Sequence, residues 1–335
     1  MNMWLESYLE HLKIEGKSAA TIRAVKADLR GLQRWWERSH QRGFDIGRLT
    51  QRDIRRWVRH RQQIDAARPN TINRGLSSLR TYSRWAVSKG LLVENPTTDV
   101  AEVATAQVAP AGLSTIAIDE LLRSAALTND AIQRRRDEAC LALLIYGGLR
   151  IQECCDVQVR DLDLAGRNVV VRSGKGGKHR RVPLSRDAYP LLKRYLVEAR
   201  FPAGLPAIGD SAEQEPLLIG RRMTVSGQPW LPGVQPQSMR KSLKELGQLA
   251  AQHLQTMSVL ESDLKRAAEL RQASQQVKNV TPHQLRHSLA WRMLKNGAKL
   301  PEVQRILGHT RLTTTGMYLN PSTDDLRDAV EKGSI

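Results

Sequence analysis

Residues 1 to about 100 carry apolar side chains at spacings of three and four, the period of an amphipathic helix. Four such stripes follow one another with short connections. Ser18 is placed to cap the second helix, and Thr50 with Asp53 resembles a capping box for the third. The fourth helix is expected to begin at about Thr71. No alternating pattern typical of a strand occurs here, so the pattern predicts a four-helix domain.

The helical pattern resumes at Ser114 and leads to an apolar helix over 139–146. The glycine pair 147–148 is expected to end that helix. Arg150 follows directly, which predicts a tight turn from which its side chain is free to project. A further helix is expected to hold Glu153.

Two short strands are predicted next, over 168–172 and 180–184, and together they form a small antiparallel hairpin. Lys175 lies in the turn that joins them. Beyond the next helix, residues 202–233 are rich in Pro and Gly and are expected to be loose.

Residues 239–278 form a long polar stretch with apolar positions near heptad spacing. The preferred interpretation is one extra packing helix. A helical hairpin and a partner-binding coil remain open as alternatives.

The last helices bring chemically versatile side chains together. His283 and Arg286 are three residues apart, one turn along a helix, so both side chains lean the same way. A second helix begins at Pro301, ends at a glycine and is followed by His309. Tyr318 comes nine residues later. Packing alone requires no such order of side chains.

The composition limits the class of binding partner. The 335 residues include 52 Lys and Arg against 34 Asp and Glu, a net charge of +18 with a pI of about 10.3. Such a cation favours a polyanion, either nucleic acid or an acidic membrane. No apolar run reaches the roughly 20 residues of a membrane span, which favours nucleic acid. Cys140, Cys154 and Cys155 form neither a disulfide framework nor a metal-binding pair, and they fit a reducing cytoplasm.

Arginines crowd the third helix of the N-terminal domain. Taken alone, such a face fits either a solvated surface or a nucleic-acid-binding one. The DNA-binding candidates are Arg48, Arg52, Arg55, Arg56 and Arg59, together with Lys178 of the later hairpin. Residues 101–113 contain Pro110 and Gly112 and are the expected linker between two domains.

Four segments resemble the tyrosine recombinases, the phage integrase family. They are YGGLRIQE, SGKGGKHRRVPL, HQLRH and LGH with a tyrosine nine residues later, in the family's order. The N-terminal helices, ending in ENP at 94–96, resemble the family's core-binding domain. The stretch 239–278 departs from the family pattern, which has one shorter helix there.

The resemblance implies a mainly α fold. It consists of a four-helix, SAM-like core-binding domain over 1–100 and an α-rich catalytic domain over 114–335 with a small antiparallel sheet, and the two form a C-shaped clamp on DNA. The tail 319–335 is expected to contact a neighbouring protomer. The implied partners are double-stranded DNA with a specific core site and three further copies of the chain, in a homotetramer on DNA that is a monomer or weak dimer when free. An accessory protein stays open as a further partner, no membrane is expected, and the expected location is the bacterial cytoplasm at the nucleoid.

Breaking a phosphodiester without a metal requires fixed cations to balance the transition state's charge. Arginine suits this task because its fork binds two non-bridging oxygens and keeps its proton. Arg150 and Arg286 are the candidates.

Further roles follow from the resemblance. Tyr318 resembles the nucleophile, which becomes joined to the DNA 3′-phosphate. Lys175 resembles the general acid, with Lys178 as the nearby fallback. His283 resembles the general base, and His309 resembles the histidine that hydrogen-bonds the scissile phosphate. Glu153 is expected to orient Arg150 or His283.

Two other chemistries are poorly supported. His283 and His287 are four apart, as in HExxH zinc proteases, but Gln284 replaces the required general base, and His287 is expected to be structural. The GKGGK turn lacks the spacing of an ATP-binding loop. No metal or other cofactor is therefore expected.

The predicted function is site-specific DNA recombination: conservative strand exchange through a 3′-phosphotyrosine and a Holliday junction, for integration, excision or resolution by an Xer-like or mobile-element enzyme. Two alternatives stay open. One is a type IB topoisomerase that nicks and reseals a single strand. The other is a non-catalytic DNA-binding regulator on the same fold.

Overall fold

The computed structural model describes residues 3–105, 112–172, 179–207, 209–220, 222–223, 229–230 and 233–308. The chain divides into two compact units, Met1–Val108 and Ala109–Ile335. Several predicted site residues and one predicted segment lie outside the described residues: Lys175, Lys178, His309, Tyr318 and the tail 319–335.

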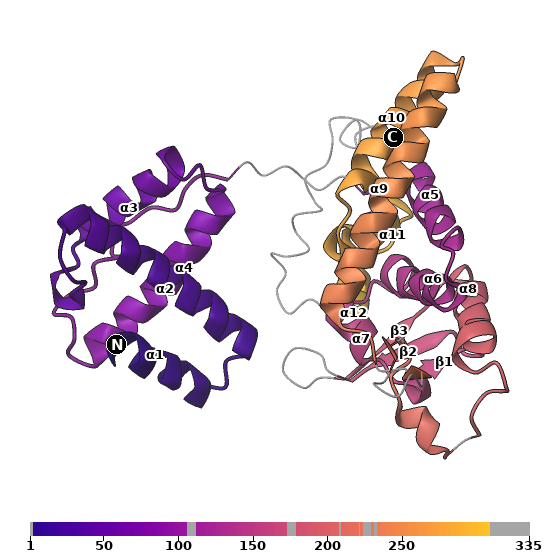
Figure 1. Ribbon diagram of the computed structural model, residues 1–335, viewed down its shortest axis with the longest axis horizontal. Helices are drawn as coiled ribbons and strands as arrows, with labels where there is room; N and C mark the ends of the chain where they lie inside the picture. Colours follow the sequence, from indigo (N-terminus) through magenta and orange to yellow (C-terminus); the bar gives the residue numbers. More distant parts are fainter. Residues whose placement is uncertain are drawn as a thin grey trace, which may run out of the picture. The chain divides into compact units, whose positions relative to one another are not determined.

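Residues 3–105 of the N-terminal unit form four α-helices, as the sequence predicts (Figure 1). They are α1 (Met3–Ile14), α2 (Ala19–His40), α3 (Gln51–Gln63) and α4 (Pro69–Ser88). The Ser18 hydroxyl accepts the Thr21 N–H, and Thr50 and Asp53 form a reciprocal capping box, so both predicted caps are confirmed. The fourth helix begins before Thr71, because Pro69 fits its first turn, where no N–H donor is needed.

Aromatic side chains fill the core of this unit. Trp36 and Tyr82 are fully buried, and the ring centroids of Trp4 and Tyr8 each lie 5.1 Å from that of Tyr82. Burying these apolar stripes against one another leaves the charged faces of the helices in solvent.

The C-terminal unit is also mainly helical. Its α-helices are α5 (Thr115–Ala126), α6 (Ala131–Ile145), α7 (Ile151–Asp156), α8 (Ala188–Tyr195), α9 (Pro236–Leu260), α10 (Leu264–Lys278), α11 (Pro282–Lys295) and α12 (Leu300–Leu307). Every residue of α6 from Asp137 to Ile145 is buried, which places this helix at the centre of the core. The predicted fold class, mainly α with a small antiparallel sheet, is confirmed.

The sheet has three strands in the order β1-β2-β3. They are β1 (Leu162–Asp163), β2 (Asn168–Val171) and β3 (Arg180–Pro183), all antiparallel, with Val169 opposite Val182. Strands β2 and β3 match the predicted hairpin, each ending one residue early. The prediction lacked β1, because two residues carry no readable periodicity.

A second, two-stranded sheet lies within the segment that was predicted to be loose. Its strands are β4 (Arg222–Met223) and β5 (Pro229–Trp230), which pair antiparallel. Strands this short also escape a search for periodicity.

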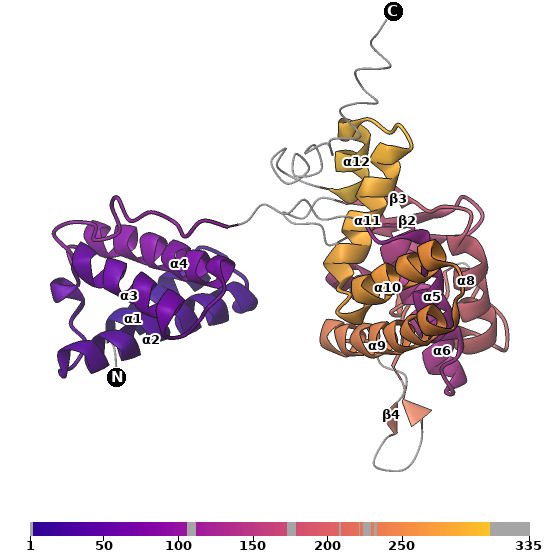
Figure 2. The same ribbon diagram turned by 90° about the horizontal axis from the view of Figure 1, so that it is seen from above.

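The stretch 239–278 forms two helices, α9 and α10, that lie side by side as a hairpin (Figures 1 and 2). The preferred interpretation of one packing helix was therefore wrong, and the hairpin alternative is the observed structure. Helix α9 ends at Leu260, and Asp263 caps α10 by accepting the Lys265 and Arg266 N–H groups. The Ser274 hydroxyl donates to the Ala251 carbonyl across the pair at 2.8 Å.

Candidate active site

The turn between α6 and α7 delivers Arg150. Gly148 has φ +62, and a β-carbon there would lie 2.8 Å from both Leu289 of α11 and Leu307 of α12. A side chain at this position would therefore strain the backbone and displace the Leu289 and Leu307 side chains. Arg150 itself is the N-cap of α7, with extended backbone.

Glu153 joins Arg150 to the rest of the site. Its carboxylate accepts the Arg150 backbone N–H at 2.8 Å and the Arg150 Nη1 at 2.8 Å. The Glu153 side chain is only 4 % exposed. Of the two expected partners of Glu153, Arg150 is hydrogen-bonded to it, and no hydrogen bond or ion pair joins Glu153 to His283 among the described residues.

A second arginine, Arg180 of β3, holds the same carboxylate. Its Nη1 donates to Glu153 Oε1 at 2.9 Å and its Nη2 to Oε2 at 2.7 Å, a bidentate pair. The sequence motifs do not single out Arg180. A signal was available, because Arg180 shares the inward-facing positions of β3 with buried Val182, and a charge at such a position needs a partner.

Arg286 lies deepest in the cluster, with 3 % of its side chain exposed. Its Nη1 donates to the Gly148 carbonyl at 2.5 Å and its Nη2 to the Leu307 carbonyl, and Glu153 Oε2 is 3.9 Å from Nη1. Burial, followed by the charge of Arg150, lowers its pKa to about 9. The guanidinium therefore remains protonated at neutral pH.

The three arginines converge on the C-terminal end of α12. Arg180 Nε donates to the Ile306 carbonyl at 3.4 Å, Arg286 donates to Leu307, and Arg150 Nη2 donates to Gly308 at 3.3 Å. The C-terminal end of a helix carries partial negative charge, which favours cations there. The cluster is thus attached to the residue that immediately precedes His309 in the sequence.

Glu153 remains ionised in this setting. Burial opposes the charged form, but the hydrogen bonds from Arg180 and Arg150 and the charge of Arg180 outweigh it and lower the Glu153 pKa to about 2. Three guanidinium groups and one carboxylate leave a positive excess, as the binding of a phosphodiester requires.

His283 lies on the first turn of α11, one turn before Arg286, with its side chain exposed. Partial burial and the charges of Arg286 and Arg150 lower its pKa, which favours neutral imidazole at neutral pH. A neutral imidazole can accept a proton. The His287 ring centroid is 6.3 Å from that of His283, and the pKa of His287 is lowered by burial and by His283.

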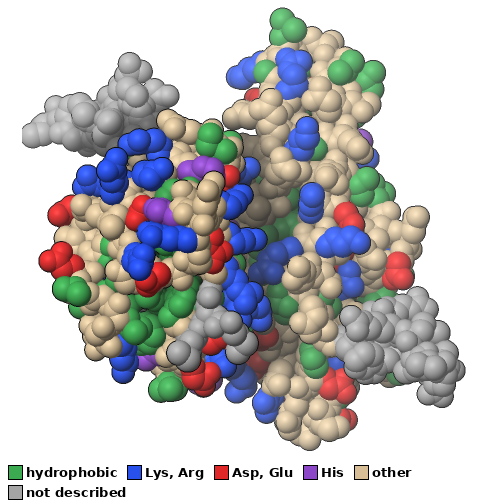
Figure 3. Space-filling model, turned by 60° about the vertical axis from the view of Figure 1, so that its left-hand side comes forward, with side chains coloured by type: hydrophobic (Ala, Val, Ile, Leu, Met, Phe, Trp, Pro, Cys, Tyr) green, Lys and Arg blue, Asp and Glu red, His purple; other side chains and the backbone are tan. Residues whose placement is uncertain are grey.

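The predicted DNA-binding arginines lie in the N-terminal unit. Arg48, Arg52, Arg55, Arg56 and Arg59 are all exposed. Arg48 pairs with Asp45 at 3.0 Å, whereas in the described part of the chain the other four form no ion pair. Figure 3 shows Lys and Arg side chains gathered in patches on the surface of this unit.

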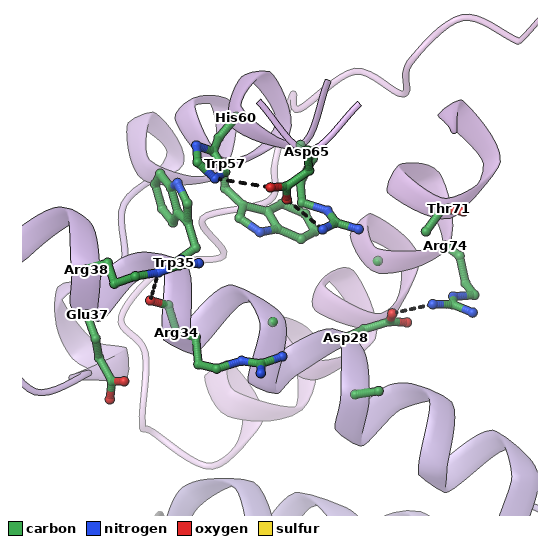
Figure 4. Close-up of a pocket in the computed structure, with 14 residues that line it drawn as sticks. Asp28, Arg34, Trp35, Glu37, Arg38, Trp57, His60, Asp65, Thr71 and Arg74 are labelled. Atoms are coloured by element: carbon green, nitrogen blue, oxygen red, sulfur yellow. Dashed lines mark hydrogen bonds and ion pairs between the residues drawn. The ribbon is translucent and has the colours of Figure 1, made fainter. Parts of the chain in front are cut away.

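A hollow of about 830 Å³ lies among α2, α3 and α4 of the same unit. Trp35 and Trp57 line it, and Asp28 and Asp65 face it with their partners Arg74 and His60 (Figure 4). None of the predicted catalytic residues borders it. The two aspartates are thus already paired within the protein, whereas Arg34 and Arg38, which also border the hollow, donate to the Arg30 and Arg34 carbonyls.

Within the described ranges, no group of three or more His, Cys, Asp or Glu side chains is arranged to hold a metal ion. No helix in the same ranges has the length and apolarity needed to cross a bilayer.

Family models match both units of the chain. The model of the phage integrase family matches residues 116–324, more than half of the chain, and the model of the phage integrase N-terminal SAM-like domain matches residues 5–90. The chain belongs to the phage integrase family. The first match spans the positions of all the predicted catalytic residues, from Arg150 to Tyr318.

Curated relatives in this family are named as tyrosine recombinases. The tyrosine recombinase XerC of Mycobacterium sp. (strain JLS) is 29% identical over 332 residues, which cover 98% of this chain and 97% of that protein. XerC of Mycobacterium bovis (strain BCG / Pasteur 1173P2) is also 29% identical, with coverage of 99% and 98%.

Solved integrases share the fold of this family member. The Tn1549 transposon integrase in complex with circular intermediate DNA matches with a TM-score of 0.62 at 18% identity, over 98% of each chain. A lambda integrase dimer bound to a COC′ core site matches with a TM-score of 0.59 at 15% identity, over 95% of this chain and 94% of that one.

Proposed function

We propose that this chain is a site-specific DNA recombinase that breaks and rejoins DNA through a covalent 3′-phosphotyrosine. The observation that carries the proposal is the arginine cluster around Glu153, attached to the end of α12 directly before His309. Cations fixed in advance stabilise developing phosphoryl charge without reorganisation. Family membership supplies the reaction that this cluster serves.

In this proposal Arg150 and Arg286 bind the non-bridging oxygens of the scissile phosphate. Arg150 is the more accessible of the two, with 34% of its side chain exposed. Arg286 uses one N–H on each of two carbonyls and retains further donors, since a guanidinium carries five. Entry of a phosphate oxygen compensates for any carbonyl contact it replaces.

Tyr318 attacks the phosphorus and frees a 5′-hydroxyl, which then attacks the phosphotyrosine of the partner duplex. His283 accepts the Tyr318 proton, consistent with its lowered pKa. His309 hydrogen-bonds the phosphate. Lys175 protonates the leaving 5′-oxygen, with Lys178 as the fallback. One ester replaces another in each step, so the bond energy is conserved.

Three of the other tyrosines are poor nucleophiles. Tyr8, Tyr82 and Tyr195 are buried in the cores of the two units, and burial raises the pKa of each. A raised pKa opposes formation of the phenolate. This supports assigning the attack to Tyr318.

DNA and further copies of the chain are the proposed partners. The Tn1549 and lambda integrases are both seen with DNA, and the latter as a dimer on a core site. We assign residues 1–100 to core-site binding through the α3 arginines, 114–335 to catalysis, and the tail 319–335 to contacts within a homotetramer. The proposed tasks are integration, excision or resolution of a mobile element, since the named relatives are recombinases and integrases rather than topoisomerases.

The test uses nicked duplexes taken from the DNA that flanks the protein's own gene, because a nick lets the cleaved strand end diffuse away. Wild type is expected to form an SDS-resistant protein–DNA adduct, and Tyr318→Phe to form none. Tyr189→Phe is the matched control, since Tyr189 is an exposed tyrosine on α8 of the same unit. An adduct with Tyr318→Phe, or DNA rearrangement without any adduct, would contradict the proposal. Nicking and resealing of one strand without exchange between duplexes would favour a topoisomerase.

A further inference from the structure

Arg180 is a buried cation of the site to which neither the sequence motifs nor the proposed mechanism gives a role. Its side chain is 15% exposed, against 34% for Arg150. It extends from β3 to Glu153 on α7 and to the Ile306 carbonyl at the end of α12. Arg180 thereby joins three elements that are separated in the sequence.

Each of its three nitrogens already donates to a group within the protein. Both terminal nitrogens bind the Glu153 carboxylate, and Nε binds the Ile306 carbonyl. A guanidinium held along its whole fork and largely shielded from solvent is poorly placed to bind DNA phosphate. Arg180 therefore has to act through the groups that it holds.

We propose that Arg180 is a positioning residue for DNA cleavage: its bidentate bond to Glu153 fixes the carboxylate that orients the Arg150 guanidinium. The inference rests on the proposed recombinase function. Each Glu153 oxygen accepts one hydrogen bond from Arg150 and one from Arg180. This sharing leaves the second terminal nitrogen of Arg150 off the carboxylate, on the Gly308 carbonyl.

Loss of Arg180 removes half of the hydrogen bonds on a buried carboxylate. Glu153 then turns to take both arms of the Arg150 fork, which withdraws donors from the phosphate. Lysine at position 180 retains the charge but offers a single ammonium in place of a planar fork. Arg180→Lys therefore keeps the positive charge but does not fix the orientation of the Glu153 carboxylate.

The test measures single-turnover cleavage of a nicked site at saturating protein. Arg180→Gln is expected to lower the cleavage rate by about 10- to 100-fold, the order expected for displaced catalytic groups, with DNA affinity nearly unchanged. The cleavage rate of Arg180→Lys is expected to lie between the rates of Arg180→Gln and wild type. The control is Arg181→Gln, the exposed neighbour on β3, which should cleave within about twofold of wild type. Wild-type rates for Arg180→Gln and Arg180→Lys would overturn the inference.

A double-mutant cycle distinguishes positioning from general support of the fold. If Arg180 acts through Arg150, adding Arg180→Gln to Arg150→Lys should lower the rate by less than about twofold, because the orientation being removed no longer matters. If Arg180→Gln lowers the cleavage rate of Arg150→Lys by the same factor as that of wild type, the inference is overturned. Thermal unfolding of each variant checks that the fold is retained, and Arg180→Lys carries the test if Arg180→Gln unfolds.

A substrate with sulfur in place of the leaving 5′-oxygen gives a second readout. A thiolate departs without protonation, so the sulfur substrate bypasses a defect in the general acid. The lower cleavage rate of Arg180→Gln relative to wild type should persist on this substrate. Restoration to the wild-type rate would place the effect on leaving-group protonation and overturn the inference. Failure of wild type to cleave either substrate would instead count against the recombinase function.

Discussion

Arginines on α3 and arginines around Glu153 share one chemistry but differ in their surroundings. Arg52, Arg55, Arg56 and Arg59 are exposed and form no ion pair among the described residues. The cluster around Glu153 shows the opposite arrangement: Arg286 is 3% exposed, and two of its N–H donors are held by backbone carbonyls.

The two sets of arginines therefore contribute to the reaction in different ways. An exposed arginine keeps its hydration and its rotamer freedom, so it attracts phosphate weakly, and salt screens that attraction. A guanidinium fixed in a water-poor site has already lost that freedom, so it can stabilise charge that develops in the transition state. We therefore expect the α3 arginines to control affinity and the cluster to control rate.

The largest effect is expected from Arg150→Ala. Removing one preorganised donor to a transition state typically lowers the rate by about 100- to 1,000-fold. Single-turnover cleavage should fall by that amount, while the dissociation constant of the DNA complex changes little. A large loss of affinity with an unchanged rate at saturation would reverse the contrast between the two sets of arginines.

Glu153→Gln tests the cluster's own stability. Lowering the Glu153 pKa from 4.5 to about 2 corresponds to about 3 kcal/mol of stability. Because the pKa is depressed, this stability is fully present above pH 4.5 and is lost as the pH falls through about 2. In urea denaturation at neutral pH, the free energy of unfolding of wild type should exceed that of Glu153→Gln by about that amount.

The difference in free energy of unfolding between wild type and Glu153→Gln should shrink as the pH falls from 4.5 to about 2. Glu269→Gln, at a carboxylate that is 43% exposed and paired with Arg266, is the control and should show a difference well under about 1 kcal/mol at neutral pH. A pH-independent difference between wild type and Glu153→Gln would mean that the carboxylate's charge is not what stabilises the cluster.

The smallest effect per residue is expected on α3. Arg55→Gln with Arg59→Gln should weaken DNA binding and reduce the slope of log affinity against log salt by about 2, because each substitution leaves one more DNA phosphate with its own counterions. Cleavage at saturating protein should stay near the wild-type rate. Arg61→Gln is the control, since Arg61 already pairs with Asp65 at 2.7 Å. An unchanged salt slope in the double variant would assign these arginines to a solvated face.

Local signals in the sequence were sufficient for the N-terminal unit. The caps at Ser18 and Thr50 involve residues three apart, so the sequence carries the complete interaction. The hairpin of α9 and α10 was harder, because a near-heptad pattern continues across the turn at Glu261–Asp263 and hides the break.

The candidate site was only partly predictable for a different reason. Motifs selected Arg150, Glu153, His283 and Arg286, and the structure brings the first two together with Arg286. The contact between Arg180 and Glu153 spans 27 residues and depends on how β3 packs against α7. Spacing along the chain does not encode such a contact, although the inward face of β3 indicated that Arg180 needed a partner.

The most direct test of the account identifies the residue that becomes joined to DNA. Trypsin digestion of the adduct, followed by mass spectrometry, should yield the peptide 312–327 carrying a nucleotide on Tyr318 through a 3′-phosphate. A nucleotide on a different peptide, such as 137–150 with Tyr146, would contradict the account, as would a 5′-linked nucleotide on Tyr318.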